Sequence, residues 1–122
     1  MDNAVETCQH VNANLVLPRS EQEDTDLYNA FKALGVNSGA LDATDVAKEG
    51  EWVDSAGQPL TYFNWFKNQP SNSHGQDHYL NYNSAMNGQW NDSRGFVSMF
   101  VVCEKPVKSR LFHGDYGIKL NL

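Results

Sequence analysis

The sequence contains no long apolar run and few basic residues, and both absences restrict its partners. No stretch of the 122 residues approaches the ~20 apolar residues that a helix needs to cross a bilayer. Nine Lys and Arg residues are outnumbered by 15 Asp and Glu residues, which gives a net charge of −6. This balance argues against nucleic acid or a membrane as a partner. The length predicts a single domain, residues 1–122, with one core.

Cysteine is also scarce, with Cys8 and Cys103 near opposite ends of the chain. A bridge between them would add roughly 4 kcal/mol in the loop-entropy model and would indicate an oxidising compartment. Two buried free thiols in a cytosolic protein would fit the same count, so both interpretations stay open at this point. Residues 1–6 include neither a basic region nor a hydrophobic segment, so we expect no secretion signal within the sequence.

A first helix is predicted near the N-terminus. Asn3 and Glu6 are three residues apart and resemble a capping pair. The apolar residues around them lie along one helical face: Ala4, Val5, Cys8 and Val11. This spacing places Cys8 on the buried side of the helix.

A second helix has a stronger start signal, because Ser20 and Glu23 form a capping box. Its apolar face consists of three residues at helical spacing: Leu27, Phe31 and Leu34. Gly35 supplies the stop. Residues 15–18, between the two helices, are predicted to be a short extended link.

After Gly35 the helical period gives way to short strands and loops. A polar stretch from Asn64 to Asn91 is long for a compact domain, and such loops are usually functional. Residues 96–103 form a near-continuous apolar run, which predicts a buried central strand. Helices followed by strands predict an α+β domain. Shorter strands are predicted at residues 40–41, 51–53, 60–63 and 79–82, with a turn at 54–57.

Four motifs occur in a specific order: Phe63-Asn64-Trp65, Gln69-Pro70-Ser71, Trp90-Asn91-Asp92 and Val101-Val102-Cys103-Glu104. In order and spacing they resemble the C-type lectin-like domain, and the resemblance extends from Cys8 to Glu104. It implies an α+β fold with two helices, antiparallel strands and a long calcium-binding loop. It also implies that Cys8 pairs with Cys103, a bridge that would place the protein in an extracellular compartment, as a secreted protein.

The sequence departs from the family pattern in its cysteines. Most members carry a second disulfide that braces the long loop. The corresponding positions here, near His78 and Gly95, hold no cysteine. We therefore expect a loop that is softer than usual or that is organised by metal alone.

The order of the strands is the second departure. In the family a first strand precedes the first helix and pairs with the last strand. Here an alternating segment at 118–122 follows another at 110–113 and a turn at 114–117. We expect a circular permutation in which residues 105–122 supply the family's first strand. A truncated domain with an unrelated tail is the alternative.

The resemblance also assigns a sugar-binding calcium site to the long loop. The corresponding residues all offer oxygen ligands: Gln69, Ser71, Gln76, Asn91 and Asp92. Gln69 and Gln76 replace carboxylates of the mannose-type pattern, so we expect weak calcium binding, in the ~10⁻⁴–10⁻³ M range of extracellular modules. In the implied function, carbohydrate hydroxyls complete the calcium shell. Gln69-Pro70-Ser71 begins like the galactose-type motif, which favours galactose, with His74 as the one ring nearby.

A second, structural calcium is used by many members, and its ligands would be Asp45, Glu49, Asn72, Gln76 and Asp77. A zinc site made of His74, Asp77 and His78 is an alternative, since imidazole and carboxylate both suit zinc. Ser71 and His74 lie close in sequence but lack an orienting partner for nucleophilic catalysis, so we do not expect an enzyme.

The alternative function is a lectin-like domain that binds a protein partner without calcium. The missing second disulfide and the loss of carboxylates favour it. Aromatic residues of the loop region could serve such an interface: Trp65, Phe66, Tyr79 and Tyr82. Asn91-Asp92-Ser93 is formally a glycosylation acceptor, but a glycan would block the proposed site, so we expect none. A homodimer would increase avidity.

Overall fold

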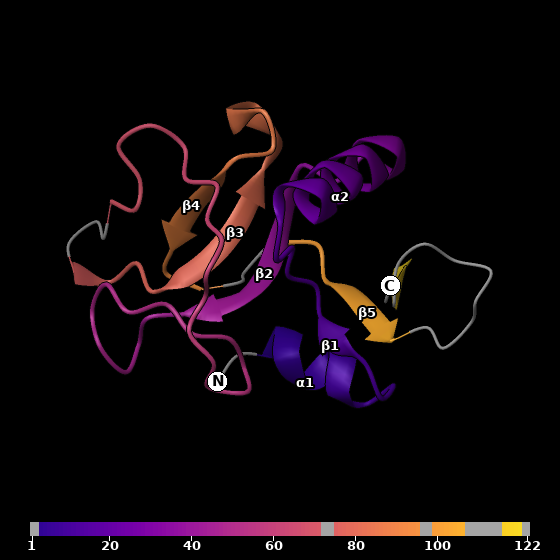
Figure 1. Ribbon diagram of the computed structural model, residues 1–122, viewed down its shortest axis with the longest axis horizontal. Helices are drawn as coiled ribbons and strands as arrows, with labels where there is room; N and C mark the ends of the chain where they lie inside the picture. The colour runs from indigo at the N-terminus through magenta and orange to yellow at the C-terminus, as the bar shows by residue number, and fades with distance from the viewer. Residues whose placement is uncertain (1–2, 72–74, 96–98, 107–115, 121–122) are drawn as a thin grey trace.

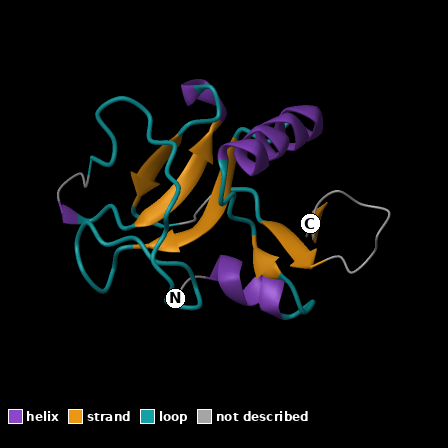
Figure 2. Ribbon diagram, viewed as in Figure 1, coloured by secondary structure: helices purple, strands orange, loops and turns teal. Residues whose placement is uncertain are grey.

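The computed structural model describes residues 3–71, 75–95, 99–106 and 116–120. Within these ranges the chain forms an α+β fold, as predicted (Figures 1 and 2). None of its helices there is long and apolar enough to span a membrane. The elements, in chain order, are α1 (Asn3–Gln9), β1 (Asn14–Leu15), α2 (Glu21–Leu34), β2 (Ser38–Thr44), β3 (Tyr79–Asn83), the 3-10 helix η2 (Ser84–Met86), β4 (Trp90–Ser93), β5 (Val102–Pro106) and β6 (Tyr116–Leu120).

Helix α2 begins and ends at the predicted residues. The Ser20 hydroxyl accepts a hydrogen bond from the Glu23 backbone N–H at 3.2 Å, which satisfies one of the free donors of the first turn. Gly35 ends the helix with φ +72°, a left-handed conformation that favours glycine. Leu27 and Phe31 are buried as expected, but Leu34, in the last turn, is 47% exposed.

Helix α1 also forms as predicted and buries Ala4, Val5 and Cys8. The prediction that Val11 shares this face was wrong, because the helix ends at Gln9 and Val11 lies in the following turn, 42% exposed. The Asn3 side chain, part of the predicted capping pair, lies outside the described residues.

The strands form two antiparallel three-stranded sheets, one in the order β2-β3-β4 and the other in the order β1-β5-β6. Figure 1 shows them on opposite sides of the molecule, with α1 beside the second sheet. In the first sheet Leu80 is opposite Asp92, and in the second Leu15 is opposite Cys103. Between β2 and β3 the chain runs through long loops that cover one side of the first sheet (Figure 2).

Two groups of buried side chains form the core. The larger lies between α2 and the first sheet, where Phe31 contacts the Tyr82 ring edge-on with 4.6 Å between centroids. Trp90, from β4, is fully buried in the same group. The smaller group surrounds Cys8 and Cys103. Both groups exclude water from apolar surface, the dominant stabilising term in folding.

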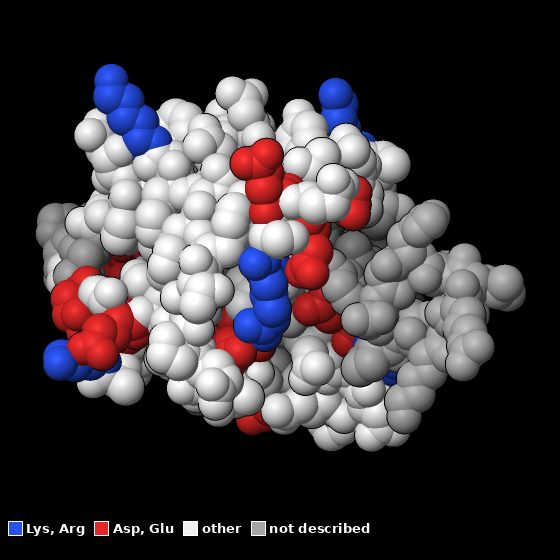
Figure 3. All heavy atoms as spheres, in the orientation of Figure 1, with Lys and Arg blue, Asp and Glu red and all other residues white. Residues whose placement is uncertain are grey.

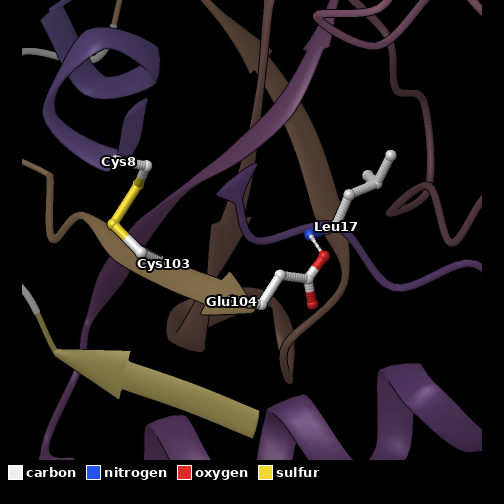
Figure 4. Close-up of a disulfide and its surroundings, with 4 residues drawn as sticks. All are labelled: Cys8, Leu17, Cys103 and Glu104. Atoms are coloured by element: carbon white, nitrogen blue, oxygen red, sulfur yellow. Dashed lines mark hydrogen bonds between the residues drawn. A yellow bond between two sulfur atoms is a disulfide. The ribbon is translucent and has the colours of Figure 1, made fainter. Parts of the chain in front are cut away.

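Cys8 and Cys103 form a disulfide, as the resemblance implied, with 5.4 Å between their Cα atoms (Figure 4). It ties α1 to β5 across 95 residues of sequence. Next to it on β5, Glu104 accepts a hydrogen bond from the Leu17 backbone N–H at 3.3 Å. Burial raises the pKa of Glu104 to about 7, although the bond from Leu17 opposes this rise.

Strand β6 pairs antiparallel with β5 over five residue pairs, from Val102 opposite Leu120 to Pro106 opposite Tyr116. A strand at the C-terminus was predicted, with slightly different bounds. The predicted segment at 110–113 lies outside the described residues. The prediction of a turn at 114–117 was wrong in its described part, because Tyr116 and Gly117 belong to β6.

Three strand predictions were wrong. Residues 51–53 and 60–63 form no strand; instead Pro59 makes an isolated bridge to Val53, which in turn bridges Thr44. The apolar run 96–103 is not one buried strand in its described part, because β5 begins only at Val102 and Phe100 is 39% exposed. Alternation and hydrophobicity mark extended chain, but they do not show whether a neighbouring strand is within hydrogen-bonding distance.

Candidate functional site

The loop around Pro70 is held against β4 by hydrogen bonds to one carboxylate. The peptide bond between Gln69 and Pro70 is cis. The Ser71 backbone N–H donates to Asp92 Oδ1 at 2.8 Å, and the Ser71 hydroxyl lies 3.1 Å from the same oxygen. The Ser71 hydroxyl is also 3.3 Å from Asp77 Oδ2. The structure therefore brings Ser71, Asp77 and Asp92 together.

Strand β4 explains how Asn91 and Asp92 are presented. Side chains alternate between the two faces of a strand, and along β4 burial alternates as well, with Trp90 and Asp92 buried and Asn91 half-buried. Asp92 is only 4% exposed and Asp77 8% exposed. Two carboxylates at this depth place negative charge where solvation is poor, which favours a bound cation.

Two amide oxygens in this region are buried without a hydrogen-bond partner among the described residues. They are Gln69 Oε1 and Asn91 Oδ1, and both belong to predicted calcium ligands. Leaving a buried acceptor unsatisfied costs roughly 1–3 kcal/mol. Amide and carboxylate oxygens are the ligands that calcium takes in proteins, so the donor set fits the ion that the sequence predicted.

Other predicted ligands are less well defined. The Gln76 side chain is exposed. Asn72 and His74 lie outside the described residues, so the predicted second calcium site and the predicted zinc site are each described only in part.

Asp45, Glu49 and His78 form a cluster that the sequence did not predict. One donor atom from each lies within 4.8 Å of the others. His78 Nδ1 is 2.9 Å from Asp45 Oδ1 and 3.6 Å from Glu49 Oε1. Asp45 and Glu49 were predicted as calcium ligands, whereas His78 had been grouped with His74 and Asp77. Within the described residues, His78 faces the first pair instead.

The cluster changes the acidity of His78 and Glu49. The hydrogen bond to the Asp45 carboxylate raises the pKa of His78, because it stabilises the imidazolium form. Loss of solvation, together with the nearby Asp45, raises the pKa of Glu49. Figure 3 shows acidic side chains gathered at the edge of the molecule where the loop after β2 lies in Figure 1.

Strand register explains the position of His78. Thr44, the last residue of β2, is paired with Tyr79, the first residue of β3. One residue beyond this pair, the Asp45 backbone N–H donates to the His78 carbonyl at 3.1 Å. The antiparallel register thus carries Asp45 opposite His78. A prediction of the β2–β3 pairing would have found this contact, but spacing along the chain could not.

A buried carboxylate on α2 anchors the start of the long loop. Asp24 is 6% exposed and accepts hydrogen bonds from the Tyr62 hydroxyl at 2.9 Å and from the Asn64 amide. Burial raises the pKa of Asp24, although these bonds oppose the rise. Nearby, Phe63 stacks on Trp65 with 5.8 Å between centroids and remains 39% exposed. The loop that leads to Gln69 is therefore fixed to the core at its base.

The aromatic residues named for a protein interface differ in burial. Tyr82 is 1% exposed and belongs to the core, which removes it from any interface. Trp65 and Tyr79 are partly buried against the two core groups.

Comparison with known proteins agrees with the fold. A family model described as the Lectin C-type domain matches residues 1–105. Pulmonary surfactant-associated protein D of Sus scrofa is 31% identical over 103 residues, which cover 84% of this chain and 27% of that protein. The chain thus spans about a quarter of the length of this relative.

Solved structures show the same architecture. The mouse scavenger receptor C-type lectin carbohydrate-recognition domain superimposes with a TM-score of 0.77 at 29% identity, covering 88% of this chain and 80% of that one. Herring type II antifreeze protein gives a TM-score of 0.75 at 24% identity, covering 87% and 82%, a likeness of fold alone. Since the family match covers most of the sequence, this chain belongs to the C-type lectin domain family.

Proposed function

We propose that the protein is an extracellular lectin that binds carbohydrate through a calcium ion held beside Pro70. The observation that carries this proposal is a pair of buried amide oxygens, Gln69 Oε1 and Asn91 Oδ1, that have no hydrogen-bond partner within the described part of the chain and lie in the region of the buried Asp92 carboxylate. The solved domain from the mouse scavenger receptor is described as a carbohydrate-recognition domain, which supports the same function here.

Calcium would be held by oxygens of Gln69, Ser71, Gln76, Asn91 and Asp92. Among these only Asp92 is negatively charged, so the affinity should lie in the weak range of extracellular modules, ~10⁻⁴–10⁻³ M. Bound calcium would supply two coordination positions for neighbouring sugar hydroxyls. Amide side chains such as Gln69 both donate and accept hydrogen bonds and would therefore form hydrogen bonds with those hydroxyls.

A galactose-type sugar is the preferred ligand in this proposal. The amide at Gln69, in place of the carboxylate of the mannose-type pattern, supports this choice. His74 is the candidate ring for the apolar face of the sugar. A competition between galactose and mannose for one binding site measures the preference directly.

The test compares the wild type with Asp92→Asn, which keeps the size of the side chain but removes its charge. In the wild type, millimolar calcium should raise the melting temperature, and sugar binding should disappear when a chelator is added. Asp92→Asn should weaken calcium binding at least about tenfold, ~1.4 kcal/mol, because it removes the one formal charge among the predicted ligands.

Asp26→Asn is the matched control, since Asp26 is an exposed carboxylate on α2. It should bind calcium and sugar like the wild type. If the wild type shows neither a calcium-dependent shift nor sugar binding at millimolar calcium, the proposal is wrong.

A calcium-independent protein-binding domain is the second candidate. The exposed Phe63 ring, stacked on Trp65, and the exposed Phe100 favour it, because large apolar side chains at a surface are common in protein interfaces. Binding of this kind should be insensitive to chelator. A Phe63→Ser variant should weaken it without changing sugar binding.

We also propose that residues 1–122 are one domain in which the C-terminal residues 105–122 supply the edge strand of the second sheet. The β5–β6 register supports this arrangement. The connection to β6 passes through residues outside the described ranges. A dimer in which two such sites act together is compatible with the proposal and would be measured by light scattering.

A further inference from the structure

The Asp45, Glu49 and His78 cluster has the ligand chemistry of a transition-metal site. It combines one imidazole nitrogen with two carboxylates, and their donor atoms lie within 4.8 Å of one another. Asp45 is 1% exposed and is fixed by the Gly50 backbone N–H, which donates to Asp45 Oδ2 at 2.9 Å. The side chains of Glu49 and His78 are 53% and 27% exposed, so they can adjust around an ion.

The orientation of the His78 ring is what an ion between these groups requires. Its Nε2 lies 3.1 Å from the Gly75 carbonyl oxygen, which can only accept a hydrogen bond. Nδ1, the other ring nitrogen, faces two carboxylates. The ring thus points one possible metal ligand toward the space that the carboxylate oxygens border. Metal-binding histidines usually donate their second N–H to such a carbonyl.

The nitrogen donor decides which metal fits. Calcium and magnesium prefer oxygen ligands alone, whereas zinc takes imidazole and carboxylate together. In a tetrahedral zinc site, ligand atoms ~2.0–2.1 Å from the metal lie roughly 3.3 Å apart. His78 Nδ1 and Asp45 Oδ1, now 2.9 Å apart, would separate by a few tenths of an ångström to admit the ion.

We propose that Asp45, Glu49 and His78 bind a borderline divalent metal such as zinc, with water in the fourth position. This site uses none of the residues Gln69, Asn91 and Asp92 on which the proposed lectin function depends. It shares Asp45 and Glu49 with the predicted second calcium site, so only one of the two ions can fill it. Zinc would tie the loop after β2 to the residues that lead into β3.

The test is a titration of calcium-free protein with Zn²⁺. Calorimetry measures the binding, and thermal unfolding measures its effect on stability. Co²⁺ serves as a spectroscopic substitute, because a four-coordinate cobalt site absorbs visible light more strongly than the aqueous ion. The wild type should bind one equivalent of Zn²⁺ and unfold at a higher temperature. His78→Gln should bind Zn²⁺ at least tenfold more weakly, and so should Glu49→Gln. Because Glu49 is exposed, that variant should fold normally.

His10→Gln is the matched control, since His10 is an exposed histidine beyond the end of α1. It should bind Zn²⁺ like the wild type. The proposal is wrong if the wild type does not bind Zn²⁺ at micromolar to millimolar concentrations. It is also wrong if His78→Gln binds as well as the wild type, or if His10→Gln loses binding equally. Calcium-dependent sugar binding should persist in His78→Gln, so failure of this site and failure of the lectin function are distinguishable.

Discussion

The half of the molecule around β1, β5 and β6 differs from the half around β2, β3, β4 and the long loops in what holds it together. The first half contains the disulfide and a small apolar group around it. The second half has an apolar core as well, but its loops depend on buried carboxylates such as Asp24, Asp45 and Asp92. Covalent and apolar contacts need no ligand, whereas buried charge is stabilised by a partner.

The comparison suggests a division of roles. The half with the disulfide should fold in the same way with or without metal. The loops near Asp45 and Asp92 should gain stability when a cation neutralises their charge, because a ligand that binds only the folded state stabilises it. Reducing agents should therefore act on one half and chelators on the other.

The largest expected effect comes from replacing both cysteines, Cys8→Ser with Cys103→Ser. A bridge that spans 95 residues contributes ~4–5 kcal/mol in the loop-entropy model, so the variant should lose roughly this much unfolding free energy. Urea denaturation with and without reducing agent measures it. An unchanged wild-type transition in reducing agent would contradict the prediction, provided that thiol titration shows the bridge to be open.

The next effect concerns β6. Removing residues 107–122 should expose the edge of β5 and destabilise the domain by ~2–4 kcal/mol, because several backbone hydrogen bonds worth ~1 kcal/mol each are lost. Placing residues 118–122 ahead of Met1 in that truncated chain should restore stability if the segment fills the position proposed for it. A truncated chain as stable as the full one would contradict the proposal.

A smaller effect is expected from the charge of Glu104. Its pKa in the folded protein is raised to about 7, above the ordinary value of 4.5, so the folded state binds the proton more tightly than the unfolded state. The stabilisation is complete below pH 4.5 and is lost as pH rises through about 7. Solvent contact limits the effect to on the order of 1–2 kcal/mol.

Glu104→Gln isolates this contribution, since the amide can still accept the bond from Leu17 without a charge. As pH rises from 4.5 through about 7 the wild type should lose stability relative to the variant, as measured by urea denaturation at each pH. Asp26→Asn, on the surface of α2, should follow the wild-type profile. If stability depends on pH in the same way in the wild type and in Glu104→Gln, the pH dependence comes from another group and the prediction is wrong.

Local signals were sufficient for several elements. The capping box at Ser20 and the glycine at 35 predict α2 because helix ends are decided by neighbours three or four residues away. Residues 60–63 have strand-like alternation but form no strand in the described chain. Pairing beside them is limited to the isolated Val53–Pro59 bridge and one bond from the Leu60 N–H to the Trp52 carbonyl. The prediction that Val11 is buried on the face of α1 was wrong because α1 ends at Gln9, before Val11 is reached.

The sequence by itself determined the fold class, both ends of α2 and the oxygen-bearing residues around Pro70, because composition, caps and ordered motifs are local properties. The tertiary structure decided that Gln69 Oε1 and Asn91 Oδ1 are buried without a partner among the described residues. It also decided that His78 faces Asp45. Both facts depend on strand register and burial, which arise only when segments distant in the sequence pack together.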